Sequence, residues 1–149
     1  MYKILIVLLA LLNFCLADYE AKVIKIIDGD TMQVLSANKE KIKIRLYGID
    51  APEKKQAYGK VSRNALADKI AGKIVKVSPN GKDRYERELA KIYLDNNEDI
   101  NRYMVRNGFA WAFVKYSKEY ASDEIYARNN KLGLWRSSNP TPPWIFRKR

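Results

Sequence analysis

The chain has 149 residues, 47% of them hydrophobic, and a formal net charge of +11, which suits one domain with a single core and favours a polyanionic partner: nucleic acid, anionic lipid or a cell-wall polymer. It has no histidine and one cysteine. This composition excludes Ser-His-Asp and Cys-His catalysis and the usual zinc sites, so that any catalysis must rest on carboxylates, Arg, Lys or Tyr.

The first 17 residues predict a cleaved signal peptide. Lys3 supplies a positive start, residues 4–16 are apolar, and Cys15-Leu16-Ala17 offers small residues for cleavage. A retained membrane anchor is one alternative, although this run is shorter than the roughly 20 residues that span a bilayer. Lipid attachment at Cys15 is another. After cleavage we expect a secreted or periplasmic protein without a thiol and without stable membrane insertion.

Three antiparallel strands are expected next, from apolar residues that alternate with polar ones over residues 20–27, 31–35 and 41–47. The first two strands are separated by Asp28-Gly29-Asp30, which is typical of a hairpin turn. In the third strand, Ile44 and Leu46 share one face, so Arg45 must lie on the opposite, polar face.

The remaining elements predict three helices and two more strands. We expect a helix over 58–70 with an apolar stripe from Val61 to Ile70, strands over 73–78 and 89–94, and helices over 99–107 and 118–131, the last capped by Ser117. Residues 79–83 have loop chemistry, and the aromatic run 109–114 is expected to be a buried crossing segment.

Five short strands with a helix between the third and fourth follow the order of an OB-fold barrel. We therefore expect an α+β protein that is mainly β barrel, with a five-stranded OB-fold and three helices. The domain should cover residues 18–138. A Pro-rich basic tail, 139–149, should follow, with Trp144 and Phe146 as possible anchors.

Two acidic turns contain the candidate ligands for a cation. Asp30 follows the first strand, and Asp50 and Glu53 follow the third. Each turn also has a structural interpretation, the first as a hairpin and the second, Asp50-Ala51-Pro52-Glu53, as a helix capping box. Alternatively, two carboxylates and a backbone carbonyl could bind Ca²⁺, while a third carboxylate orients or deprotonates water.

Basic residues near these turns could bind a phosphate. Arg45, and the stretch Asp83-Arg84-Tyr85-Glu86-Arg87, could equally be solvated surface. Two arginines could instead hold the non-bridging oxygens of a phosphodiester and stabilise its pentacoordinate state. Together with the acidic turns, they predict phosphodiester hydrolysis without histidine.

Three ordered segments resemble the signature blocks of the staphylococcal nuclease family: Ile27 to Thr31, Arg45 to Glu53, and Asp83 to Ala90. The resemblance extends from about Val23 to Trp135. It implies a Ca²⁺-dependent, sugar-nonspecific nuclease, a monomer that hydrolyses DNA and RNA and leaves 3′-phosphate ends.

The same resemblance implies the metal and catalytic residues. Asp30 and Asp50 would bind Ca²⁺ through their side chains, and Ala51 through its carbonyl. Glu53 would be the general base or would position the water. The scissile phosphate would be held by Arg45 and Arg87, and the substrate would be contacted by Arg84, Tyr85 and Tyr116.

One departure from the family concerns Glu86, which replaces a common glycine and places a negative charge beside Arg87. It could turn this arginine away or weaken phosphate binding. A noncatalytic OB-fold nucleic-acid-binding module, and a cell-surface or envelope-polymer binding protein, remain as alternatives.

Overall fold

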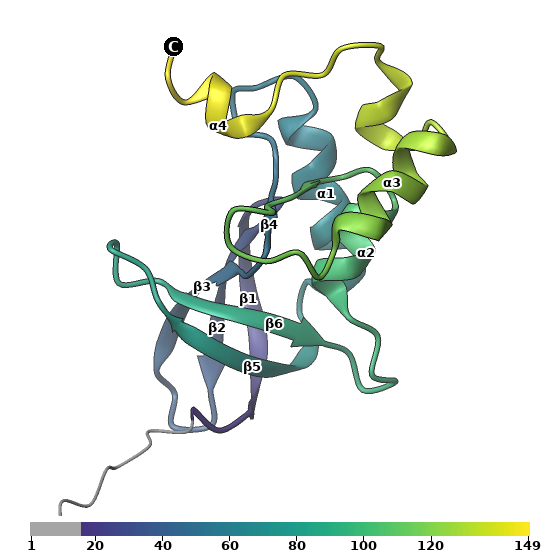
Figure 1. Cartoon of the computed structure of the whole chain (residues 1–149). Helices are drawn as coiled ribbons and strands as arrows, with labels where there is room; N and C mark the ends of the chain where they lie inside the picture. The colour runs from purple at the N-terminus through teal and green to yellow at the C-terminus, as the bar shows by residue number, and fades with distance from the viewer. Residues whose placement is uncertain (1–15) are drawn as a thin grey trace, which may run out of the picture.

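A computed structural model describes residues 16–149, so nearly all of the predicted signal peptide lies outside the described residues. Five strands form a closed barrel in the order β1-β2-β3-β6-β5 (Figure 1). They are β1 (Tyr19–Asp28), β2 (Thr31–Ser36), β3 (Lys41–Leu46), β5 (Ile74–Lys82) and β6 (Glu88–Tyr93). The predicted five-stranded barrel is therefore confirmed.

One strand pair brings the later arginines to the earlier acidic turns. Neighbouring strands of the barrel are antiparallel except β3 and β6, which run parallel with Arg45 opposite Leu89. The hairpin that leads into β6 therefore ends beside the C-terminal half of β3, where Arg45 lies.

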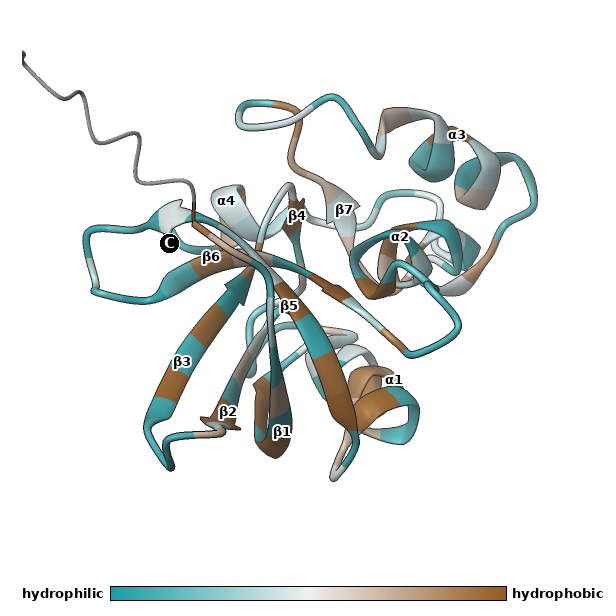
Figure 2. Ribbon diagram, turned by 90° about the horizontal axis from the view of Figure 1, so that it is seen from below, coloured by the Kyte–Doolittle hydropathy of each residue, from teal (hydrophilic) through white to brown (hydrophobic). Residues whose placement is uncertain are grey.

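Alternation along the strands builds the core. Met32, Val34, Ile44 and Leu46 have no exposed surface, and burial of such a side chain contributes about 1.5–3 kcal/mol. Figure 2 shows the resulting bands of hydrophobic and hydrophilic residues along the strands. Since Arg45 lies between two buried neighbours, its side chain leaves the opposite face of β3.

The helices lie over one end of the barrel (Figure 1). They are α1 (Gly59–Ile70), α2 (Ile100–Arg106), α3 (Ala121–Asn129), a 3-10 helix, η1 (Gly133–Arg136), and a short α4 (Pro143–Phe146). A second small sheet pairs β4 (Ile49–Asp50) with β7 (Trp111–Ala112). Across residues 16–149, none of the helices combines the length and apolarity needed to cross a membrane.

Two predicted boundaries were wrong. Residues 79–82 belong to β5 rather than to a loop, because Pro79 pairs with Ala90 and an irregularity before Lys82 absorbs the turn-forming residues. The third long helix begins at Ala121 rather than at residue 118, and its N-cap, Tyr120, makes no side-chain capping bond.

The apolar stripe predicted for the first helix is also partly wrong. Leu66 and Ile70 are buried, but Val61 is 45% exposed. The small residues Gly59 and Ser62 are buried instead. They let α1 approach the loop before it and the β1–β2 turn, as the contacts of Gly29 and Gly59 show.

The C-terminal segment packs on the domain rather than trailing away from it. The Trp144 ring stacks on Phe113, with centroids 5.5 Å apart and an interplanar angle of 4°, and meets Trp111 edge-on at 6.3 Å. The Gln56 amide donates to the Thr141 carbonyl at 2.5 Å. The tail is therefore fixed beside the small β4–β7 sheet, at the helical end of the barrel.

Candidate active site

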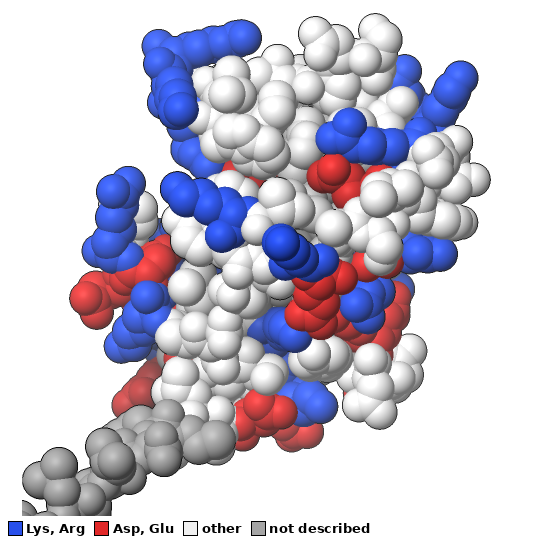
Figure 3. All heavy atoms as spheres, in the orientation of Figure 1, with Lys and Arg blue, Asp and Glu red and all other residues white. Residues whose placement is uncertain are grey.

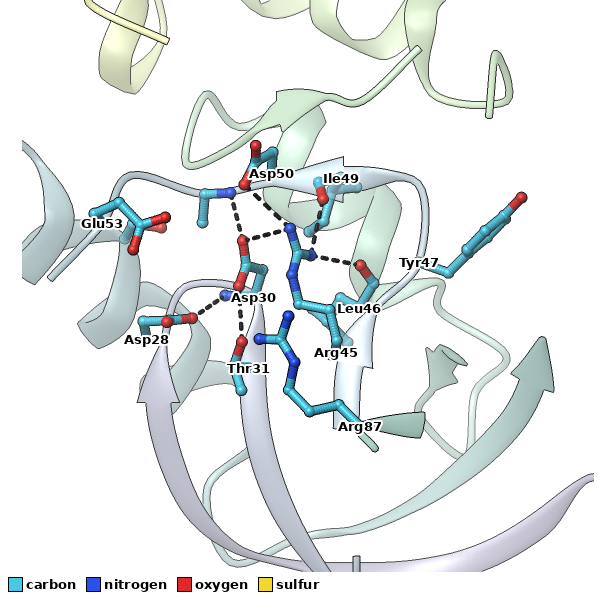
Figure 4. A network of polar contacts seen from close by, with 12 residues as sticks. Asp28, Asp30, Thr31, Arg45, Leu46, Tyr47, Ile49, Asp50, Glu53 and Arg87 are labelled. Atoms are coloured by element: carbon cyan, nitrogen blue, oxygen red, sulfur yellow. Dashed lines mark hydrogen bonds and ion pairs between the residues drawn. The ribbon is translucent and has the colours of Figure 1, made fainter. Parts of the chain in front are cut away.

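Arg45 joins the two acidic turns at the end of β3. Its Nη2 lies 3.1 Å from Oδ1 of Asp50 and 3.2 Å from Oδ2 of Asp30. Its Nη1 donates to the carbonyls of Leu46 at 2.8 Å and Ile49 at 2.9 Å. Figure 4 shows the guanidinium between the two carboxylates. The interpretation of Arg45 as a solvated surface residue was wrong, since only 12% of its side chain is exposed.

Asp30 links the first acidic turn to the segment after β4. Its Oδ2 accepts the Ala51 N–H at 2.7 Å, and its Oδ1 accepts the Thr31 hydroxyl at 2.9 Å. Burial raises the pKa of Asp30, but the charge of Arg45 and these hydrogen bonds outweigh burial and hold the pKa below its ordinary value. Asp30 is therefore a fixed, ionised carboxylate.

Asp28 contacts Asp30 within the first acidic turn. The sequence had suggested only that Asp28 helps to form this turn. Its Oδ1 accepts the backbone N–H of Asp30 at 3.0 Å. Burial, and then the charge of Asp30, raise the pKa of Asp28 to about 7. The turn thus contains one carboxyl whose pKa is lowered and one whose pKa is raised.

Asp50 and Glu53 occupy an irregular segment, so the capping-box interpretation was wrong. Asp50 ends β4 and is fully buried. Five residues of turns and bends separate Glu53 from α1, and the Glu53 N–H donates to Oε1 of Gln56 at 3.0 Å. Burial raises the pKa of Asp50 despite two guanidinium groups beside it. The Glu53 side chain is 36% exposed, more than those of Asp30 and Asp50.

Arg147 is a residue of this site that sequence reasoning missed. Its Nη2 donates to Oδ2 of Asp50 at 2.8 Å, and its Nη1 donates to Oδ1 of Asp50 at 3.1 Å and to Oε1 of Glu53 at 2.7 Å. Its separation from Asp50 by 97 residues left no local pattern. The one available signal was Trp144, the aromatic anchor that places this segment.

Arg87 points toward the same cluster but pairs with its own hairpin. Its Nε donates to Oδ2 of Asp83 at 2.7 Å, while Oδ1 of Asp83 accepts the N–H groups of Tyr85 and Arg87. Figure 4 shows its guanidinium close to Arg45 and Thr31. The two predicted phosphate-binding arginines are thus brought together.

Arg84 and Tyr85 lie farther out, on the β5–β6 hairpin. Tyr85 is 63% exposed, and its hydroxyl accepts a hydrogen bond from Nη2 of Arg84 at 2.7 Å. The guanidinium carbons of Arg84 and Arg87 lie 4.8 Å and 5.5 Å from the Tyr85 ring centroid. An exposed aromatic ring beside two cations suits contacts with a nucleic-acid strand.

Tyr116 is exposed but contacts none of the predicted catalytic residues in the described part of the chain. Its ring packs edge-on against Phe113 at 4.9 Å, and its carbonyl accepts the Tyr47 hydroxyl at 2.9 Å. With 59% of its surface exposed, it can still serve as a stacking surface.

Basic side chains are mixed with acidic ones on the face of the molecule that Figure 3 shows. Figure 3 shows Lys and Arg side chains along the side of the molecule where α4 and the β5–β6 hairpin lie, with acidic groups interspersed. The basic side chains among them suit the binding of a polyanion.

The donor set of this cluster fits a hard divalent cation. Asp30 and Asp50 offer carboxylate oxygens, and the Ala51 carbonyl lies directly beyond Asp50 in the chain. Within residues 16–149, no group of three acidic, His or Cys side chains converges tightly enough for a metal centre. Two carboxylates and one carbonyl would therefore be completed by water, a set suited to Ca²⁺. Asp50 already binds a cationic group, Arg147, with both oxygens.

The chain is similar to nucleases along most of its length. It is 41% identical over 135 residues to an uncharacterized endonuclease of Escherichia coli O157:H7, covering 89% of this chain and 88% of that protein. A micrococcal nuclease of Shigella flexneri is 38% identical over 144 residues, covering 89% and 82% of the two chains. Residues 43–137 match the family model described as staphylococcal nuclease homologue. This chain therefore belongs to the staphylococcal nuclease homologue family.

Proposed function

We propose that this protein is an exported, Ca²⁺-dependent nuclease that hydrolyses phosphodiester bonds of DNA and RNA and leaves 3′-phosphate ends. The coarser activity, hydrolysis of phosphodiesters, follows from family membership and from the nuclease names of the relatives. Export is supported by the signal-peptide pattern of residues 1–17, and Ca²⁺ by the all-oxygen donor set.

The observation that supports this function most strongly is the meeting of three separate segments. One nitrogen of Arg45 bonds to Asp50 and lies 3.2 Å from Asp30. Arg87 comes from a third segment and is drawn beside them in Figure 4. A barrel that only bound nucleic acid would need the positive charge but not two buried carboxylates.

The two arginines differ in what they can offer a phosphate. Both terminal nitrogens of Arg45 face protein oxygens, namely two carbonyls and two carboxylates. Arg87 bonds to Asp83 through Nε alone in the described structure, so its Nη groups can donate to two phosphate oxygens. We infer that Arg45 mainly holds Asp30 and Asp50 in place, whereas Arg87 stabilises charge on the phosphate.

Glu53 is the group that can accept a proton from the attacking water. It is the most exposed of the three carboxylates, whereas Asp30 and Asp50 are held in bonds to Arg45. Bound Ca²⁺ would supply charge neutralisation on the phosphate and a site for water. Attack in line then expels the 5′ oxygen, while Arg87 donates to the phosphate as its negative charge increases.

The test uses Glu53→Gln and Arg87→Ala, which change groups that are partly exposed. In plasmid and RNA digestion with Ca²⁺, we expect Glu53→Gln to lose about 10²–10⁴ of the rate and Arg87→Ala about 10³. Glu40→Gln, an exposed carboxylate in the β2–β3 turn, is the matched control and should cut at the wild-type rate.

Chelation and binding assays separate the proposal from a noncatalytic module. EGTA should abolish cleavage by the wild type. If the wild type retards labelled DNA on a gel but never cuts it with Ca²⁺, the protein is a binding module and the proposal is wrong. Equal rates for wild type and Glu53→Gln would remove Glu53 from its assigned role.

A further inference from the structure

Arg147 fills the acidic cluster, so a metal ion and a substrate cannot occupy the cluster at the same time as Arg147. It reaches both oxygens of Asp50 and one oxygen of Glu53, at 2.7–3.1 Å. The hydrogen bonds that Arg147 donates to Asp50, and then to Glu53, raise the pKa of Arg147 above its ordinary value. The C-terminal segment therefore supplies its own cation to the residues proposed to bind metal and to activate water.

The segment before Arg147 is built to hold it there. Pro142 and Pro143 lead into the turn of α4, whose Trp144 stacks on Phe113. Gln56 bonds to the tail through Nε2 and to the Glu53 N–H through Oε1. The tail and the Glu53 loop are thus joined by the same amide, and Figure 1 shows α4 at the helical end of the molecule, above β4.

The two arginines of the cluster differ in their exposure and in the number of hydrogen bonds that hold them there. Arg45 is 12% exposed and bonds to two backbone carbonyls in addition to its carboxylates. Arg147 is 41% exposed and, among its side-chain contacts in the described structure, pairs only with Asp50 and Glu53. Arg147 can therefore swing into water without leaving a buried donor unsatisfied, whereas Arg45 cannot.

Asp50 cannot bind both Arg147 and a divalent cation with its full affinity for each. Its Oδ1 already accepts from Arg45, so Oδ2 is the oxygen best placed for a metal, and Oδ2 accepts from Arg147. A guanidinium at hydrogen-bond distance would also repel the metal, because like charges about 4 Å apart interact unfavourably even near a protein surface.

We propose that residues 142–149 form a latch that closes the acidic cluster and that a divalent cation opens by displacing Arg147. This proposal rests on the proposed Ca²⁺-dependent nuclease function. Competition between Arg147 and the metal sets the metal affinity of the site. The latch keeps the carboxylates neutralised at low Ca²⁺ and makes the enzyme respond only where Ca²⁺ is abundant.

The experiment measures Ca²⁺ binding to the chain by calorimetry in the absence of nucleic acid. Arg147→Ala should bind Ca²⁺ about tenfold more tightly than the wild type, which is the size of a typical coupling between competing ligands. Arg147→Lys should be intermediate, because it retains the charge but not the two-pronged bond. Arg149→Ala, an exposed arginine of the same tail, is the matched control and should leave the affinity unchanged.

A second readout follows the tail itself. Ca²⁺ should change tryptophan fluorescence of the wild type when Trp144 loosens from Phe113, and the change should be reduced in a Trp144→Phe variant. If Arg147→Ala binds Ca²⁺ no more tightly than the wild type, the latch is refuted, even if the wild type cleaves DNA. If neither protein cleaves DNA or binds Ca²⁺, the nuclease proposal fails and the latch fails with it.

Discussion

Gly29 and Ser62 lie in direct contact across the interface between the first acidic turn and α1. A Cβ on Gly29 would lie 1.8 Å from Oγ of Ser62 and 2.9 Å from Cβ of Ala51. Gly29 is absent from the described residues with positive φ, so the close approach requires glycine here, not the backbone conformation. Ser62 is fixed in turn, because its hydroxyl donates to the Phe109 carbonyl at 2.7 Å.

Gly29→Ala should therefore destabilise the protein and disturb the site. The new methyl group must displace α1 or the turn, and overpacking of this kind costs about 1–3 kcal/mol. Urea unfolding measures the cost, and adding Ser62→Ala should recover part of it, since it removes the nearest atom. Unchanged stability of Gly29→Ala would show that the turn can move away from α1 freely.

Asp28 makes the stability of the protein depend on pH in a definite direction. The pKa of Asp28 is raised to about 7 in the folded protein, mainly by burial, whereas in the unfolded chain it is about 3.9. Between these values the folded state binds more protons than the unfolded state, so Asp28 makes stability decrease as pH rises. The loss is complete once the pH exceeds the folded-state pKa.

Asp28→Asn should remove this decrease. An asparagine oxygen can still accept the Asp30 N–H, but it cannot ionise. From pH 5 to pH 8, the free energy of unfolding of the wild type should fall by about 1–3 kcal/mol relative to that of Asp28→Asn. Urea unfolding at both pH values, with a chelator present, gives the comparison. Parallel pH profiles for the two proteins would contradict the prediction.

The barrel could be predicted because its signals are local. Strand alternation placed Ile44 and Leu46 inward and Arg45 on the other face, and the structure buries Ile44 and Leu46 completely. The errors arose where tertiary contact overrides a local rule. Asp50 and Glu53 fit a capping box in sequence, yet β4 pairs with β7, from a distant part of the chain, and draws this segment out of helix.

The candidate site was predictable only as far as its residues lie in ordered motifs. Asp30, Asp50 and Arg45 were named from such motifs, and the structure brings them into contact. The partner of Arg87, Asp83, depends on the conformation of a hairpin. Arg147 depends on where a Pro-rich tail folds back, which is set by the stacking of Trp144 on Phe113 rather than by any periodic pattern.

Glu86 combines backbone strain with an unfavourable charge, and two substitutions can separate the two. Its φ of 62° lies in the left-handed region, where a residue other than glycine is strained by roughly 1–2 kcal/mol. The hairpin imposes this conformation, because the N–H groups of both neighbours, Tyr85 and Arg87, converge on Asp83. The carboxylate is also adjacent to the arginine proposed to bind phosphate.

Glu86→Gly should raise the free energy of unfolding by about 0.5–1 kcal/mol, whereas Glu86→Gln, which keeps the side chain, should leave it nearly unchanged. Both should strengthen binding to labelled duplex DNA, since both remove a negative charge near Arg87. The binding assay uses proteins that also carry Glu53→Gln, to prevent cleavage. The gain in DNA affinity should shrink at high salt. Interactions between charges are largely screened beyond about 8 Å at physiological ionic strength, and over shorter distances as salt rises. If Glu86→Gly strengthens binding and Glu86→Gln does not, backbone conformation rather than charge controls the position of Arg87.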